Sequence, residues 1–150
     1  MPRLEIDNYY VEELLVKSNS SYEYDPESLP GGIEPDINFD FYRKDEADPR
    51  FLVKFRVELG EGDAQLPYHI RLLLFASFDA SNDANQTLID QLVATNAAPI
   101  LYGIARGIVG QTTAQAVHGR FVLPTVNFIE LMNEKVRALQ AVEAPTSITS

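Results

Sequence analysis

The residues best suited to acid–base or metal chemistry are few in this 150-residue chain and are poorly spaced for it. It has two histidines, His69 and His118, and no cysteine, so it carries no thiolate site and no His-x-x-His or His-Glu-x-x-His motif. The glycines from Gly103 to Gly110 lack the Lys-Ser/Thr pair of a phosphate-binding loop. We therefore expect no catalytic residue, no metal and no cofactor, and predict that the protein is not an enzyme.

Aromatic side chains suit a different chemistry, which is apolar contact with tolerant geometry. The aromatic residues considered for this role in the expected sheet are Phe39, Phe41, Phe51, Phe55, Tyr68 and Phe78. Most are expected to pack beneath helices, whereas a subset at a sheet edge, beside the long connection 18–32, would line an open groove. In such a groove the contact area, rather than hydrogen-bond geometry, provides the affinity.

An excess of acidic side chains limits the partners. The chain has 22 Asp and Glu against 12 Lys and Arg, which gives a net charge of −10. Nucleic acids and anionic lipids need clustered cations, so neither is an expected partner, whereas a basic protein is compatible. The carboxylates fall on polar strand faces and in turns, as at Asp45-Glu46 and Glu61-Gly62-Asp63, which predicts solvated positions for them.

No targeting or membrane segment is evident. The N-terminus has no apolar stretch behind a basic one, and no apolar run approaches the roughly 20 residues of a membrane helix. We expect a cytoplasmic protein without membrane insertion, and the absence of cysteine is compatible with a reducing compartment. The length corresponds to one domain, residues 1–150, of which 143–150 is expected to be a disordered tail.

Strand patterns occupy the first half of the chain. Residues 33–41 and 51–59 alternate apolar and polar side chains, which predicts two strands joined by a loop over Arg43–Pro49. A further strand is expected over 66–78, where Leu73 and Phe75 make the second face partly apolar, so it should lie inside the sheet or under a partner. A long first strand is also predicted near the N-terminus, because several even-numbered residues there are apolar or aromatic: Leu4, Ile6, Tyr10, Leu14 and Val16.

Helix signals occupy the second half. An N-cap at 81–83 precedes an apolar segment over 88–92. Pro99 suits the first turn of a helix that runs to about Ala116, and Asn127 is expected to cap a last helix that runs through Val142.

The helix predicted from Pro99 is almost uncharged. Arg106 is the only formally charged residue between Asp90 and Arg120, and the apolar residues spread around more than one face. Its glycines each cost roughly 1 kcal/mol of helix propensity relative to alanine. Such a helix must be covered on several sides, and one sheet covers only one of them. We infer that a second subunit covers another side, where small residues admit its backbone.

Two segments of this second half resemble the SecB family of protein-export chaperones. Residues 98–106, APILYGIAR, resemble the start of that family's main helix, whose pattern is P-x-I-L-F-P-Y-A-R. Residues 119–128, GRFVLPTVNF, resemble its R-G-x-F-P-x-x-x-L-x-P-V-N-F loop, with Pro124, Val126, Asn127 and Phe128 carrying the match. Upstream the element order agrees, so the resemblance spans the domain and is specific over about 98–128.

The resemblance implies an α+β fold, a four-stranded antiparallel sheet followed by helices, assembled as a homotetrameric dimer of dimers. It also implies an ATP-independent holdase that binds unfolded polypeptides and keeps them competent for translocation in protein export. By position, the client-peptide groove would be lined by Ile33, Ile37, Phe39, Phe41, Tyr68 and Ile104. The resemblance and the lack of charge on the helix together predict an oligomer interface at Ile100, Gly103, Gly107, Ile108 and Gly110. Two groove positions, Ile33 and Ile104, are aliphatic where the family has an aromatic residue.

In that family an acidic outer sheet face docks the zinc-bearing tail of the motor protein SecA. Glu13 matches one of those acidic positions, but Lys17 and Arg71 stand where acids are expected and oppose a basic tail. An alternative is therefore a SecB-like chaperone that serves another client, such as the antitoxin of a toxin–antitoxin system. An alternative of another class is a hot-dog-like acyl-binding enzyme, which a closed pocket with a strongly perturbed carboxylate would favour.

Overall fold

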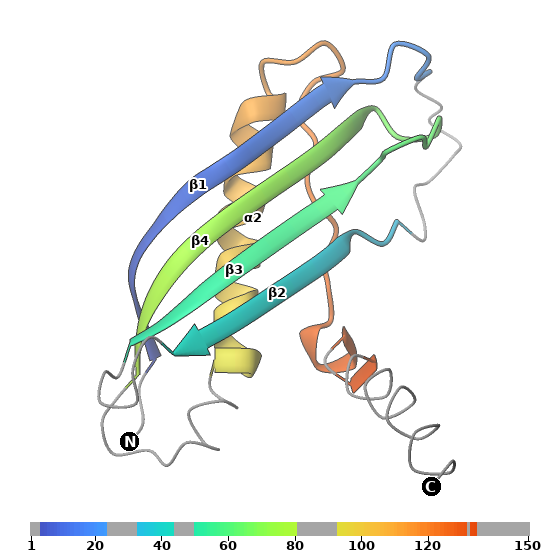
Figure 1. Ribbon diagram of the computed structural model, residues 1–150. Coiled ribbons are helices and arrows are strands. Elements are labelled where there is room, and N and C mark those ends of the chain that lie inside the picture. Colours follow the sequence, from blue (N-terminus) through green and yellow to red (C-terminus); the bar gives the residue numbers. More distant parts are fainter. Residues whose placement is uncertain (1–3, 24–32, 44–49, 81–92, 132, 135–150) are drawn as a thin grey trace, which may run out of the picture.

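A single antiparallel sheet with helical structure behind it forms the fold (Figure 1). The computed structural model describes residues 4–23, 33–43, 50–80, 93–131, 133 and 134. The strands lie in the order β1-β4-β3-β2. The elements are β1 (Leu4–Ser18), β2 (Asp36–Arg43), β3 (Arg50–Leu59), β4 (Tyr68–Ala80), the π-helical turn η1 (Val93–Ala97) and α2 (Ala98–Thr113). The predicted α+β class and the four-stranded antiparallel sheet followed by a helix are confirmed.

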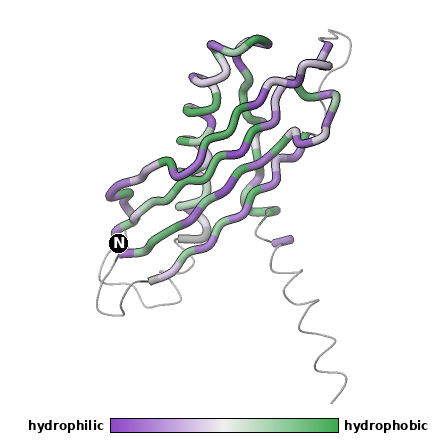
Figure 2. The backbone as a smooth tube through the Cα atoms, turned by 45° about the horizontal axis from the view of Figure 1, so that its top comes forward, coloured by the Kyte–Doolittle hydropathy of each residue, from purple (hydrophilic) through white to green (hydrophobic). Residues whose placement is uncertain are grey.

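Alternation along β3 and β4 builds the core. The odd-numbered residues of 51–59 and the even-numbered residues of 68–78 are all buried, and they form one cluster with the buried face of α2. Figure 2 shows the matching alternation of hydrophobic and hydrophilic residues along the strands. β4 lies between β1 and β3, the interior position that its partly apolar second face predicted.

β1 contains two irregularities that the alternation in its sequence does not reveal. Its register with β4 shifts near residues 7 and 12. Each shift turns the following side chains to the other face of the sheet. Tyr10 therefore pairs with Phe75 on the outer face, and the two rings stack with centroids 5.6 Å apart. The predicted long strand is confirmed, but the prediction that Tyr10 shares a face with Ile6 is wrong.

The segment after α2 runs back along the helical side of the sheet and is tied to the helix (Figure 1). The Tyr102 hydroxyl donates a hydrogen bond to the carbonyl oxygen of Pro124, and the Phe121 amide donates to Thr113 Oγ1 at 2.8 Å. Burial raises the pKa of Tyr102 to about 12, so the phenol stays a neutral donor at physiological pH. Leu123, from the same segment, is fully buried in the core.

The helix boundaries follow the predicted capping residues closely. Pro99 lies in the first turn of α2, as predicted. The helix ends at Thr113 rather than near Ala116, because the Thr113 hydroxyl accepts the Phe121 amide and joins the last turn of the helix to the returning chain. Asn127 caps the next helix, as predicted, since its Oδ1 accepts the amides of residues 129 and 130 at 3.1 and 3.2 Å.

Several predicted elements fall outside the part of the chain that the structure describes. They are the connection over 24–32, the loop over 44–49, the helix around 88–92, the end of the last helix over 135–142 and the tail 143–150. Within the described residues, no helix is both long and apolar enough to cross a membrane.

Candidate functional site

β2 is an edge strand, and its helix-facing side holds the clearest part of the predicted groove. Ile37, Phe39 and Phe41 alternate on this side; Ile37 is buried, whereas Phe39 and Phe41 are half-buried against the margin of the core. The two rings lie 6.5 Å apart between centroids and are nearly parallel, at 17°. Ile33, just before the strand, is also half-buried. We call Ile33, Phe39 and Phe41 the β2 rim.

Two predicted groove residues lie elsewhere in the fold. Ile104 is half-buried on α2, at the margin of the same core. Tyr68 is only 1% exposed. Its hydroxyl donates to the carbonyl oxygen of Gly119 at 2.7 Å and accepts the His118 amide at 3.0 Å. Tyr68 therefore ties the returning segment to β4 and offers no surface to a ligand, which removes it from the candidate groove.

One face of α2 is left uncovered by the residues that the structure describes. Ile100 is 36% exposed, Gly103 and Gly107 are exposed, and a Cβ atom built on either glycine would have no neighbour within 4 Å. Ile108 borders this face and is half-buried. These two glycines are four residues apart and so lie on one side of the helix, where the lack of side chains permits a close helix–helix approach.

Gly110 lies differently from the other predicted interface residues. It is buried, and a Cβ atom there would be 3.4 Å from Nε of Arg120, a residue of the same chain. The uncovered face of α2 is therefore formed by Ile100, Gly103 and Gly107, with Ile108 at its border.

The other edge of the sheet also carries apolar surface. Within the described residues, β1 pairs with β4 alone, so no strand pairs with its second side. Ile6, Tyr9, Val11 and Leu14 pair with core residues of β4 and hence lie on the helix-facing side, yet each is between 37% and 44% exposed. A strand edge with an apolar flank is suited to pairing with another chain.

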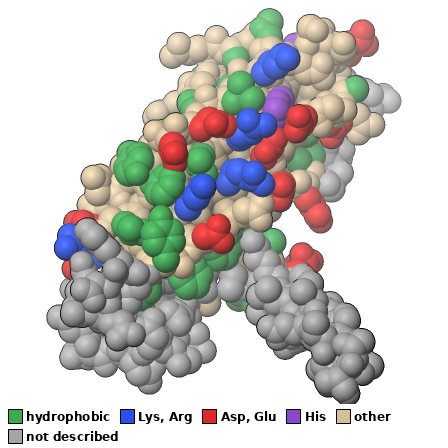
Figure 3. All heavy atoms as spheres, in the orientation of Figure 1, with side chains coloured by type: hydrophobic (Ala, Val, Ile, Leu, Met, Phe, Trp, Pro, Cys, Tyr) green, Lys and Arg blue, Asp and Glu red, His purple; other side chains and the backbone are tan. Residues whose placement is uncertain are grey.

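Charged residues dominate the middle of the outer sheet face, and apolar side chains gather toward one end (Figure 3). Arg71 contacts two carboxylates, with Nη1 3.4 Å from Glu13 Oε1 and Nη2 3.4 Å from Glu58 Oε1. His69 Nε2 lies 3.2 Å from the same Glu58 oxygen. The hydrogen bond to His69, and next that from Arg71, lower the pKa of Glu58 below its ordinary value. Glu13 thus has a cationic neighbour, so it is a weaker attractant for a basic tail.

A hollow at the end of the β3–β4 hairpin bears on the acyl-enzyme alternative. It has a volume of about 500 Å³ and is formed by residues 17–21 and 60–64 with His69, none of which has a large apolar side chain. A chain of methylene groups requires walls of large apolar side chains, so this hollow does not suit it. The nearby Glu58 has a lowered rather than a raised pKa, so it is not a carboxyl group held protonated for acid catalysis.

No model of a known protein family matches the chain, and no curated protein matches its sequence.

Solved structures do share its fold. One is a SecB-like chaperone of Mycobacterium tuberculosis in complex with a ChAD peptide from the HigA1 antitoxin, with 15% identity and a TM-score of 0.57 over 83% of this chain and 91% of that chain. Another is a protein of unknown function from Streptococcus agalactiae, with 12% identity and a TM-score of 0.52 over 83% of this chain and 99% of that chain. The SecB-like fold that residues 98–128 predicted is thereby confirmed.

Proposed function

We propose that this protein is an ATP-independent holdase of the SecB type, which binds non-native polypeptides in the cytoplasm and has no catalytic role. The observation that carries the proposal is the half-buried pair of rings on the edge strand β2, Phe39 and Phe41, in a fold shared with a SecB-like chaperone. That chaperone was solved with an antitoxin peptide, which supports a non-native or extended polypeptide as the ligand here.

The mechanism follows from what the β2 rim can do chemically. Aromatic rings held by a rigid strand provide contact area without fixed hydrogen-bond partners, so they accept many apolar sequences. Burial of such contacts contributes roughly 25 cal/mol per Å² of apolar surface, and each single contact is therefore weak. An unfolded chain offers many apolar segments in succession and rebinds after each dissociation, whereas a folded protein has buried them.

Assembly is the second part of the proposal. A homotetrameric dimer of dimers would cover the exposed face of α2 at Gly103 and Gly107 and the apolar flank of β1, which are separate surfaces on this chain. Several copies of the β2 rim in one particle would raise the effective concentration of binding sites along a bound polypeptide. A homotetramer would thus strengthen holding without any further contact per subunit.

Holding is tested directly with a chemically denatured, slow-folding protein diluted into buffer without ATP. We expect the protein to suppress the light scattering of the aggregating client at a stoichiometric ratio, and an equal mass of serum albumin to leave it unchanged. Refolding of the client, followed by intrinsic fluorescence, should slow at the same ratio. Unchanged aggregation and refolding at a tenfold excess of the protein would refute the proposed function.

For the downstream partner, we propose an antitoxin-type client rather than the SecA motor. Arg71 Nη1 lies 3.4 Å from Glu13 Oε1, and Lys17 pairs with His69 on the same outer face. Positive charge therefore lies beside Glu13, the acidic position that matches the SecA-docking surface of the SecB family. Like charges placed together at an interface can cost several kcal/mol. The export role therefore has less support than holding itself.

Calorimetric titration with the basic zinc-bearing tail peptide of SecA tests this choice. We expect weak or undetectable binding by the parent protein and a measurable gain for the double variant Lys17→Glu with Arg71→Glu. The matched control is Arg50→Glu with Lys54→Glu, which makes the same change in net charge at two exposed positions of β3 outside the row of Glu13. Micromolar or tighter binding by the parent protein would restore the export role.

A further inference from the structure

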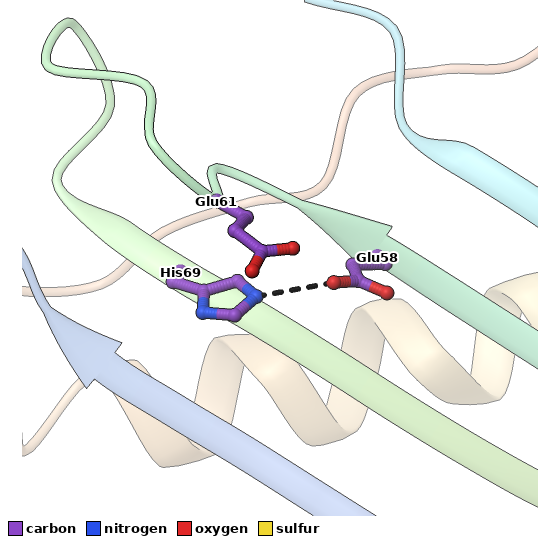
Figure 4. Close-up of side chains that lie close together, drawn as sticks. All are labelled: Glu58, Glu61 and His69. Atoms are coloured by element: carbon purple, nitrogen blue, oxygen red, sulfur yellow. Dashed lines mark hydrogen bonds and ion pairs between the residues drawn. The ribbon is translucent and has the colours of Figure 1, made fainter.

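Three side chains from separate parts of the β3–β4 hairpin converge on one point of the outer face (Figure 4). Glu58 comes from β3, His69 from β4 and Glu61 from the turn between them. One ligand atom from each, a carboxylate oxygen or an imidazole nitrogen, lies within 4.8 Å of the other two. Figure 4 shows the carboxylates of Glu61 and Glu58 both turned toward the imidazole ring of His69.

The backbone of the turn holds Glu61 in this place. Gly60 and Gly62 flank it with φ angles of +88° and +71°, a region that side-chain-bearing residues rarely adopt. A Cβ atom at Gly60 would lie 2.0 Å from the carbonyl oxygen of Tyr68, so only glycine fits where the turn passes β4. The convergence therefore depends on a tightly specified turn and not on a loop that could place Glu61 anywhere.

The donor set suits a divalent transition-metal ion. Imidazole nitrogen together with carboxylate oxygen is typical of Zn²⁺ and its neighbours, whereas Ca²⁺ and Mg²⁺ prefer oxygen donors alone. The distance between His69 Nε2 and Glu58 Oε1 is 3.2 Å. Two ligands about 2.0–2.1 Å from a tetrahedral zinc ion lie roughly 3.3 Å apart, so this pair already has a suitable spacing.

The surroundings favour a site with open coordination positions. The side chains of Glu58 and His69 are only 16% and 17% exposed, which limits their freedom, while Glu61 is exposed. Glu61 and His69 also line the hollow of about 500 Å³, which leaves room for water or for a donor from another molecule. Arg71 donates a hydrogen bond to Glu58 and orients its carboxylate. Arg71 and Lys17 also add positive charge near the site, so its affinity for a metal ion should be moderate.

We propose that Glu58, Glu61 and His69 form a binding site for a divalent transition-metal ion such as Zn²⁺. The three side chains supply one nitrogen and two oxygen ligands, and the remaining positions face the hollow. The site lies on the outer sheet face, on the side of the sheet opposite the β2 rim, so it is independent of client holding.

Titration of Zn²⁺ into the full-length protein, followed by calorimetry, tests the site. We expect saturable binding of one ion per chain in the micromolar range, and an affinity about tenfold or more weaker for Glu61→Gln, since loss of one ligand commonly costs that much or more. Glu61 is exposed in the turn, so this variant should fold normally. Glu130→Gln removes an exposed carboxylate elsewhere and should bind as the parent does.

The two histidines allow a second readout. In ¹⁵N-edited spectra of the imidazole rings, Zn²⁺ should shift the His69 signals and leave those of His118 in place, because His118 Nε2 donates to the carbonyl oxygen of Asn19 at 2.8 Å. His69→Gln should abolish binding. No saturable binding below about 1 mM, or equal affinity in the parent, Glu61→Gln and His69→Gln, would overturn the proposal.

Discussion

Gly107→Leu is expected to lower the mass of the proposed homotetramer from four chains to two or one, as measured by light scattering at micromolar concentration. Gly107 lies on the exposed face of α2, and a Cβ atom there would meet no described residue of its own chain within 4 Å. A leucine at this position therefore does not clash with the described part of the subunit, whereas it would separate a second helix that packs against the glycine face. Replacing glycine also removes a helix penalty of roughly 1 kcal/mol, so the subunit should keep its helical circular dichroism.

The control for this prediction is a leucine of the same size on the opposite side of the sheet. Asn38→Leu changes an exposed residue on the outer face of β2, and the mass should remain at four chains. Gly110 is unsuitable as a second test, because its substitution would disturb Arg120 within the subunit. If Gly107→Leu assembles as the parent does, the α2 face is not a subunit interface.

Phe39→Ser combined with Phe41→Ser is expected to abolish the suppression of client aggregation while the assembly keeps its mass. These residues are the two aromatic members of the β2 rim, and both are half-buried at the edge of the sheet. Removing both rings deletes most of the apolar contact area at the rim, and loss of one buried aromatic anchor commonly costs 2 kcal/mol or more of binding free energy. We therefore expect client affinity to fall by at least about tenfold.

A matched pair of aromatic residues on the outer face provides the control. Tyr10→Ser with Tyr42→Ser removes two rings that are 58% and 47% exposed on the side of the sheet away from α2, and holding should persist. A Tyr68→Ser variant would be uninformative, because it would break two buried hydrogen bonds and destabilise the fold. Undiminished holding by the Phe39/Phe41 variant would show that clients bind elsewhere.

Local pattern by itself determined most of the sheet and the starts of the helices. The alternation in 33–41, 51–59 and 66–78 predicted β2, β3 and β4 because each strand has one side against the same core, and a strand then repeats every two residues. Pro99 and Asn127 predicted helix starts because the first amides of a helix need either no partner or a side-chain acceptor. The motif over 98–128 predicted the SecB-like fold that solved structures share.

Burial and exposure at the candidate groove were decided by contacts between distant segments. Tyr68 lies on the same face of the sheet as the other even-numbered residues of β4. The segment at 118–121 covers it and forms hydrogen bonds with its hydroxyl group. Phe39 and Phe41 stay half-buried because β2 is an edge strand. A side chain's place in the alternation shows which face it occupies, but the cover over that face comes from residues about fifty positions away.

The tertiary structure alone decided the faces of β1 and the convergence of Glu58, Glu61 and His69. The two register shifts in β1 place Tyr10 on the outer face, and no residue type in the strand predicts them. The three possible metal ligands are separated by three and eight positions and match no motif; the turn through Gly60 and the pairing of β3 with β4 bring them together. The same physical reason explains the bulges in β1 and the closure of the β3–β4 hairpin. Each depends on hydrogen bonds to a neighbouring strand, and the alternation of residues within one strand contains no information about its neighbour.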